Sequence, residues 1–154
     1  MSHRDVLPTS LIKFHKNCTK LFDTIDSIDS FKLANKINTR IEKQRLTGLI
    51  EINTSGDKNK NGFKPELSDE LIKCLHLNNL NINGLMTLGP FSQDPSETRT
   101  AFVLLRKFLD TINKETGSEK LTHLSMGMSG DYQIAIEEGS TMVRVGTSLF
   151  GTRQ

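Results

Sequence analysis

A chain of 154 residues with 35% hydrophobic and 25% charged residues is long enough to bury one core and typical of a single globular domain. Its net charge of +2 is too small to indicate nucleic-acid binding. No run is long and apolar enough to cross a bilayer, and the amino terminus lacks the apolar core of a secretory signal. Cys18 and Cys74 show neither C-x-x-C nor zinc-ligand spacing. We therefore expect no metal site and a cytoplasmic protein, with mitochondria as an additional location.

Strand and helix patterns alternate along the chain after residues 1–20, a poorly defined segment without clear periodicity. Alternating apolar residues predict strands, and apolar residues three or four positions apart predict helices. The predicted strands are 21–27, 46–53, 82–88, 121–126 and 141–145. Four helices are predicted. The first has Phe31, Ala34, Ile37 and Ile41 on its apolar face, and the second starts at Phe63-Lys-Pro65 with Leu67, Leu71, Ile72 and Leu75 on its apolar face. The third covers 96–113 and the fourth 132–137. Polar groups at 27–30 are suited to capping the first helix.

This order of elements predicts the fold class α/β, with a parallel sheet and crossover helices. A complete (β/α)8 TIM barrel needs about 250 residues. Five strands and about four helices therefore predict a partial (β/α)8 barrel, made of about its last five strands, in a domain over residues 21–154.

The stretch over 124–153, LSMGMSGDYQIAIEEGSTMVRVGTSLFGTR, carries the strongest functional pattern. Two hydroxyl-bearing loops, 125–129 and 146–148, bracket Arg144, and loops at the carboxyl ends of adjacent parallel strands face one mouth. Small residues let the backbone approach a ligand, while N–H and hydroxyl groups bind phosphate oxygens. The pattern predicts a phosphate-binding site beside an arginine. Alternatively, Gly139 and Gly146 are turn glycines, and Ser129 caps the following helix.

Other polar and sulfur-containing residues have simpler explanations. The lysine-rich run over 57–64, DKNKNGFK, is typical of a solvated loop. Asn53 and Thr54 end a strand on the side of the site, and turn formation explains them equally well. His123 has no obvious partner and is assigned no role. The methionines of these strands suit core filling better than contact with a cofactor ring; they are Met86, Met126 and Met128.

Several stretches, read together, resemble the pyridoxal phosphate homeostasis proteins, also called the YggS or proline synthase co-transcribed family. These stretches are LFDTIDSIDSFKLANKIN, LIEINTSGDKNKNGF, INGLMTLGPF and the segment over 124–153. The family is similar to the amino-terminal barrel of alanine racemase and implies pyridoxal 5′-phosphate (PLP) as cofactor. By this resemblance Ser125 and Ser129 offer hydroxyls to the phosphate, Gly146 and Thr147 offer N–H groups, and Arg144 lies near the pyridine nitrogen.

The resemblance covers about six-sevenths of this chain but only the carboxyl-terminal portion of a family member. The family carries its cofactor lysine on the first strand, in a motif like V-S-K, and also has an H-F-I-G-x-L-Q-x-N-K segment. Neither has a convincing copy here, so Lys13 and Lys16 receive no role. The resemblance therefore implies a truncated chain that contacts PLP through its phosphate and ring, without a covalent bond.

Three functions follow from these observations. The first is a non-catalytic PLP-binding protein of intracellular vitamin B6 homeostasis, with no nucleic-acid or membrane partner. The second is a non-binding fragment, or a module that needs a partner chain or self-association through exposed strand edges to complete the barrel. The third is an amino-acid racemase, which is poorly supported because it needs a lysine and an opposing acid–base group, and the only tyrosine, Tyr132, lies on a short helix.

Overall fold

The computed structural model describes residues 5–6, 22–41 and 46–151. Its strands form one parallel sheet in which every strand lies beside its neighbours in the sequence, in the order β1-β2-β3-β4-β5-β6. The strands are β1 (Asp5–Val6), β2 (Thr24–Ile28), β3 (Leu46–Glu51), β4 (Leu80–Met86), β5 (His123–Met128) and β6 (Met142–Arg144). The predicted α/β half-barrel is confirmed, with the two-residue β1 added at one edge.

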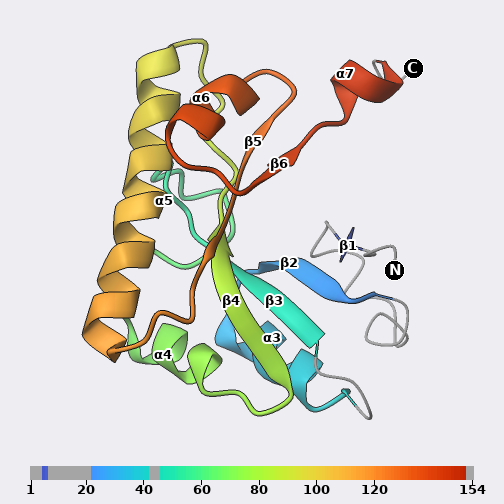
Figure 1. Cartoon of the computed structure of the whole chain (residues 1–154), viewed down its shortest axis with the longest axis vertical. Helices are drawn as coiled ribbons and strands as arrows, with labels where there is room; N and C mark the ends of the chain where they lie inside the picture. The colour runs from blue at the N-terminus through green and yellow to red at the C-terminus, as the bar shows by residue number, and fades with distance from the viewer. Residues whose placement is uncertain (1–4, 7–21, 42–45, 152–154) are drawn as a thin grey trace.

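Helices connect the strands, as a parallel sheet requires. They are α3 (Phe31–Asn38), α4 (Asp69–Leu75), α5 (Pro95–Thr116), α6 (Tyr132–Glu137) and α7 (Thr147–Phe150). In Figure 1 the long helix α5 runs along the left of the sheet, with α6 to the right of its upper part and α4 and α3 to the right of its lower part. The single turn α7 stands away from these helices at the end of β6. The predicted phosphate loops directly follow two of the strands: one loop follows β5, and the other lies between β6 and α7.

The hydrophobic core lies between the sheet and the helices. It combines β-branched and leucine side chains of the strands with the apolar face of α5, whose Phe102, Leu105 and Ile112 have no exposed surface. Full burial of each such side chain contributes about 1.5–3 kcal/mol. The apolar face of α5 thus covers one face of the sheet.

Capping residues set the helix boundaries. Ser30 accepts a hydrogen bond from the N–H of Leu33, which confirms the expected cap within 27–30. Asp94 caps α5 and Pro95 follows at its first turn, where a proline loses no helical hydrogen bond. Gly117 ends α5 with φ of 62°, a left-handed conformation that favours glycine. Ile41 lies beyond α3 but still packs against the core.

The predicted start of the second helix at Phe63-Lys-Pro65 is wrong. Phe63 instead forms a parallel bridge with Ile52, because its N–H donates to Glu51 O and its carbonyl accepts from Asn53 N, both at 2.8 Å. The helix α4 begins only at Asp69, after Ser68 accepts a hydrogen bond from Leu71 N. Leu67 therefore lies outside the helix and is 37% exposed, not on a buried face.

Strand positions differ from the predictions by a few residues. The first predicted strand lies later, at β2, and Leu21 falls outside the described residues. The predicted strand 82–88 is β4, which ends at Met86 and leaves Leu88 41% exposed. The last three predicted elements correspond to β5, α6 and β6, and the bounds of α6 agree with the prediction. Within the part of the chain that the structure describes, no helix is long and apolar enough to cross a membrane.

Two glycines permit close packing against β5, one near its start and one near its end. A Cβ atom at Gly84 would lie 2.2 Å from His123 O, so glycine lets β4 and β5 pair at this point. Gly127 has φ of 96°, and a Cβ there would lie 2.5 Å from the Cβ of Ala135. Glycine at 127 therefore lets α6 pack directly on β5, just before the loop that carries Ser129.

Candidate functional site

The predicted phosphate loops lie at the carboxyl ends of two adjacent strands. Arg144 is the last residue of β6 and is in register with Met128, the last residue of β5. Ser129 begins the loop after β5, and Gly146 and Thr147 follow β6. The parallel pairing therefore brings both loops to one end of the sheet, as the sequence predicts.

Arg144 is held by two acceptors, one in β5 and one directly after β4. Its Nη1 donates to Ser125 Oγ at 2.6 Å, and its Nη2 donates to the carbonyl oxygen of Thr87 at 2.7 Å. Ser125 and Thr87 are fully buried, while Arg144 is half-buried. Two bonds to two different segments of the chain fix the plane of the guanidinium, since a fork of N–H donors has defined directions.

Three carboxylates partly offset the effect of burial, which lowers the pKa of Arg144. Burial lowers the pKa of the guanidinium, whereas the carboxylates of Asp26, Asp131 and Glu51 raise it, in that order. Asp26 and Glu51 are only 2% and 6% exposed. An arginine stays protonated in proteins, so Arg144 provides a permanent positive charge on this side of the sheet.

Ser129 joins the two loops directly. Its Oγ accepts hydrogen bonds from the N–H groups of Gly146 and Ser148, both at 3.2 Å. A hydroxyl that accepts two bonds still has its own proton to donate. The alternative that Ser129 caps the next helix is wrong, because Asp131 precedes α6 and accepts a bond from Met128 N at 2.6 Å.

Gly146 and Thr147 are exposed. A Cβ atom at Gly146 would meet no heavy atom within 4 Å, so the space beside this glycine is open. Its φ of −116° needs no glycine, so backbone strain does not explain the residue. Gly139, in contrast, has φ of 88° and is a turn glycine, as the alternative interpretation expects. Open space beside an exposed hydroxyl and backbone N–H groups fits a phosphate group.

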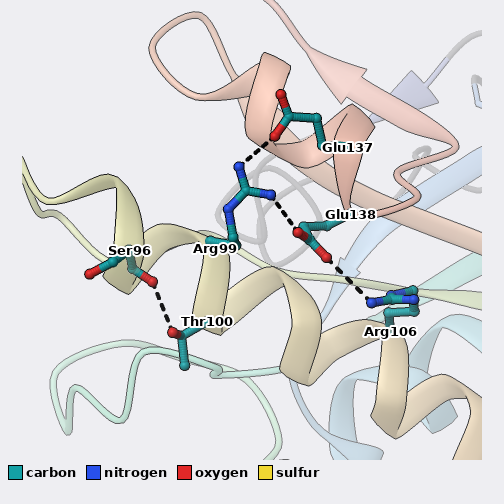
Figure 2. Close-up of polar contacts among 6 residues, drawn as sticks. All are labelled: Ser96, Arg99, Thr100, Arg106, Glu137 and Glu138. Carbon is teal, nitrogen blue, oxygen red and sulfur yellow. Dashed lines mark hydrogen bonds and ion pairs between the residues drawn. The ribbon is translucent and has the colours of Figure 1, made fainter.

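The helix α6, which follows the Ser129 loop, is tied to α5 by ion pairs (Figure 2). Glu138 bridges two arginines: Arg99 Nη1 lies 2.5 Å from its Oε1, and Arg106 Nη2 lies 3.3 Å from its Oε2. Glu137 binds the other nitrogen of Arg99. These hydrogen bonds, with Glu137 first and Glu138 second, raise the pKa of Arg99. The link fixes α6, and with it one end of the loop that carries Ser129.

Three further polar residues lie in the segments after β3 and β4, and the sequence placed only Thr54 among them on the side of the site. Thr87 Oγ1 lies 2.8 Å from Ile52 O and 2.8 Å from Thr54 Oγ1. Lys60 Nζ donates to Gly89 O at 2.7 Å and joins two loops. The expectation of a solvated loop holds for the exposed Lys58 but not for Lys60. Thr87 lies inside the predicted strand 82–88, so the sequence pattern gave it no role at the site.

The remaining candidates have structural roles. The Asn53 side chain donates to Asp57 O and Lys60 O, so it organises a turn. Met86 and Met126 are buried in agreement with core filling, but Met128 is 41% exposed. Among the residues that the structure describes, no group of three or more His, Cys, Asp or Glu side chains could hold a metal ion.

The family model that matches this chain is that of the alanine racemase N-terminal domain, over residues 13–154. The chain therefore belongs to the alanine racemase N-terminal domain family. Its curated relatives are named pyridoxal phosphate homeostasis protein. The relative from Aquifex aeolicus is 43% identical over 133 residues, 84% of this chain and 58% of the relative. The human relative is 37% identical over 139 residues, 84% of this chain and 50% of the relative. The chain thus spans between half and three-fifths of their length.

Solved structures agree with this membership. PipY of Synechococcus elongatus with PLP bound has a TM-score of 0.85 and 29% identity, covering 97% of this chain and 70% of that chain. A protein of unknown function from Bifidobacterium adolescentis has a TM-score of 0.80 and 37% identity, covering 94% of this chain and 58% of that chain. Alanine racemase of Clostridium difficile, at 19% identity and a TM-score of 0.70, shares the fold, with 96% of this chain and 38% of that chain covered.

Proposed function

We propose that the chain binds PLP at the carboxyl ends of β5 and β6 and serves intracellular PLP homeostasis without catalytic turnover. One observation carries the proposal: Arg144, fixed by Ser125 and Thr87, stands beside two loops that Ser129 joins. The names of the curated relatives and the PLP-bound structure of PipY support PLP as the ligand. The cofactor, its contacts and the role in homeostasis are all part of this proposal.

The phosphate of PLP would bind the Ser129 and Thr147 loops. The hydroxyl of Ser129 has a proton to donate, and Thr147 offers an exposed hydroxyl and a backbone N–H. The N–H of Gly146 bonds to Ser129 in this structure, so a phosphate oxygen would either share that donor or replace Ser129 as its acceptor. Ser125 is fully buried against Arg144 and would contribute through that arginine as well as by its own hydroxyl.

The pyridine ring would lie beside Arg144. When bound, PLP supplies a reactive aldehyde and an electron-withdrawing ring. Arg144 cannot accept a proton from the ring nitrogen, and its positive charge disfavours ring protonation. An unprotonated ring withdraws electrons less strongly, which suits holding the cofactor better than broad carbanion chemistry. Racemisation also lacks a candidate acid, because the only tyrosine of the sequence, Tyr132, lies on α6.

A PLP titration of the purified protein tests the proposal. We expect saturable binding, followed by absorbance and by calorimetry, that weakens about tenfold in Ser129→Ala, because a hydrogen bond to a charged group contributes about 1.5–3 kcal/mol. Ser118→Ala is the matched control, since Ser118 lies beyond α5 and its Oγ accepts from the nearby Lys120 N. The absence of saturable binding, or an equal loss in both variants, would contradict the proposal.

The chemistry of the bond is tested separately. The sequence has no V-S-K motif, so we expect non-covalent binding. Borohydride reduction of the PLP-treated protein, followed by peptide mass analysis, should label no unique lysine. One lysine peptide labelled at stoichiometric yield would show that a covalent site exists in this chain.

A second candidate function is that of a module completed by another chain. Among the described strands β6 pairs only with β5, so its other edge is open. Leu149 and Phe150 beside that edge are 71% and 87% exposed. Open edges and exposed apolar side chains favour association.

A further inference from the structure

A chain of buried hydroxyls crosses the sheet at the carboxyl ends of β3 and β4. Thr87 follows β4 and has no exposed surface, and Thr54 follows β3 and is 9% exposed. Their hydroxyl oxygens lie 2.8 Å apart. Buried polar groups that bond to one another in this way cost little when all are satisfied and much when one partner is removed.

The directions of these hydrogen bonds follow from counting protons. Each threonine hydroxyl has one proton. Thr87 Oγ1 donates that proton to the carbonyl oxygen of Ile52, which offers no donor of its own, at 2.8 Å. In the contact between the two threonines, Thr54 must therefore be the donor and Thr87 the acceptor. The chain of bonds runs from Thr54 to Thr87 and ends on the carbonyl oxygen of Ile52, the residue directly after β3.

This arrangement fixes the backbone of Thr87 from two sides. Its hydroxyl bonds to Ile52 O beside β3, and its N–H donates to Ser125 O in β5 at 3.1 Å. The carbonyl oxygen of the same residue accepts from Arg144 Nη2 at 2.7 Å. The second acceptor of Arg144, the side chain of Ser125, belongs to the same β5 residue that holds the N–H of Thr87. The position of the guanidinium thus depends on where the hydroxyl of Thr87 is anchored.

The geometry points to Thr87 as a positioning residue, supported by Thr54, that sets the direction in which Arg144 presents its guanidinium to a bound ring. This inference rests on the proposed PLP site for its functional meaning, but the contacts that define it lie within the protein. Thr54 acts on Arg144 through Thr87, whose hydroxyl it contacts. Loss of either hydroxyl should loosen Arg144 without changing any residue that would touch PLP.

The first measurement needs no cofactor. In the nitrogen NMR spectrum of the guanidinium groups, the two Nη atoms of a fixed arginine give separate signals, and free rotation averages them. We expect separate Arg144 signals in the wild-type protein and in Thr87→Ser, which keeps the hydroxyl. We expect averaged signals in Thr87→Val, which has nearly the same shape but no hydroxyl. Arg144→Lys identifies the signals.

The second measurement is the Kd for PLP, with inorganic phosphate as a probe of the phosphate loops alone. We expect Thr87→Val to weaken PLP binding about tenfold and Thr87→Ser to restore it, with the affinity for phosphate unchanged in both. If the wild-type protein binds no PLP, the proposed function fails, while the NMR comparison still tests whether Thr87 positions Arg144.

Two other variants keep the test decisive if Thr87→Val folds poorly. Thr54→Val removes only the supporting donor, and we expect a smaller change of the same kind in the Arg144 signals. Thr111→Val is the matched control, because its hydroxyl donates to Lys107 O on the exposed side of α5, and it should leave both readouts unchanged. Separate Arg144 signals in both Thr87→Val and Thr54→Val would overturn the inference.

Discussion

The thiol of Cys74 shows how burial sets the chemistry of a single residue. Cys74 lies in the core with no exposed surface, and desolvation, followed by the charge of Glu70, raises its pKa to about 12. The reactive form of cysteine is the thiolate, which such a pKa makes negligible at neutral pH. Cys74 is therefore a small apolar core residue, as the absence of a cysteine motif in the sequence suggests.

We predict that Cys74 is inert to thiol reagents in the folded protein. In a Cys18→Ser background, where Cys74 is the only cysteine, Ellman's reagent at pH 8 should release no colour from native protein and one equivalent after denaturation. Raising the pH to 9 should change little, because the thiol stays protonated well below its pKa. Rapid stoichiometric labelling of native protein would show that the site opens readily.

Arg144 and Ser129 show at the same scale what a sequence can and cannot reveal. Their residue types and their position after predicted strands indicated a site for an anion. That Ser129 bonds to Gly146 and Ser148, and that Arg144 bonds to Thr87, could not be predicted, because these contacts join segments separated by 17–57 residues. Such contacts depend on strand register, which local patterns do not specify.

At the scale of elements, local signals predicted the helices wherever tertiary contacts did not compete with them. The helix predicted over 132–137 has the same bounds as α6. Asp94 and Pro95 mark the start of α5. The proline at 65 looked like a similar start, but Phe63 is held beside Ile52 by two backbone hydrogen bonds. Pairing with a distant strand outweighed a weak local preference, which is the usual way in which propensity fails.

The link between α5 and α6 leads to a prediction about salt. Glu138 is the shared partner of Arg99 and Arg106, so Glu138→Gln removes both ion pairs (Figure 2). We expect a lower midpoint of thermal unfolding at low ionic strength. The difference from wild type should shrink in 1 M NaCl, where the screening length falls to about 3 Å. Glu115→Gln, a substitution at an exposed position of α5, should leave the unfolding midpoint nearly unchanged at either salt concentration.

At the scale of the whole molecule, the sequence predicted the number and order of the principal strands correctly, because each βα unit carries its own periodicity. It could not show which edge would carry apolar side chains. That edge is β6, where Val143 is 39% exposed and α7 adds the exposed Leu149 and Phe150. The edge strand β6 and the helix α7 lie on the same side of the structure (Figure 1).

We predict that the isolated chain self-associates through this edge. Sedimentation velocity at increasing protein concentration should show a rising mean mass, and the double change Leu149→Ser/Phe150→Ser should lower it. Phe91→Ser is the matched control, because Phe91 is fully exposed but lies in the loop between β4 and α5. A wild-type protein that remains monomeric at every concentration would contradict the prediction, as would an equal effect of Phe91→Ser.

The strand order of the sheet is the same as the order in which the chain is synthesised. Each new strand of the described sheet pairs with the strand made just before it, so every pairing can form once its second strand has left the ribosome. β3 and β4 need only residues up to Met86 to meet. Arg144, Gly146 and Thr147 come from the last strand and the loop after it. The groups proposed to hold PLP are therefore assembled only after the first five described strands have been made, and a chain interrupted before β6 would keep most of its sheet without them.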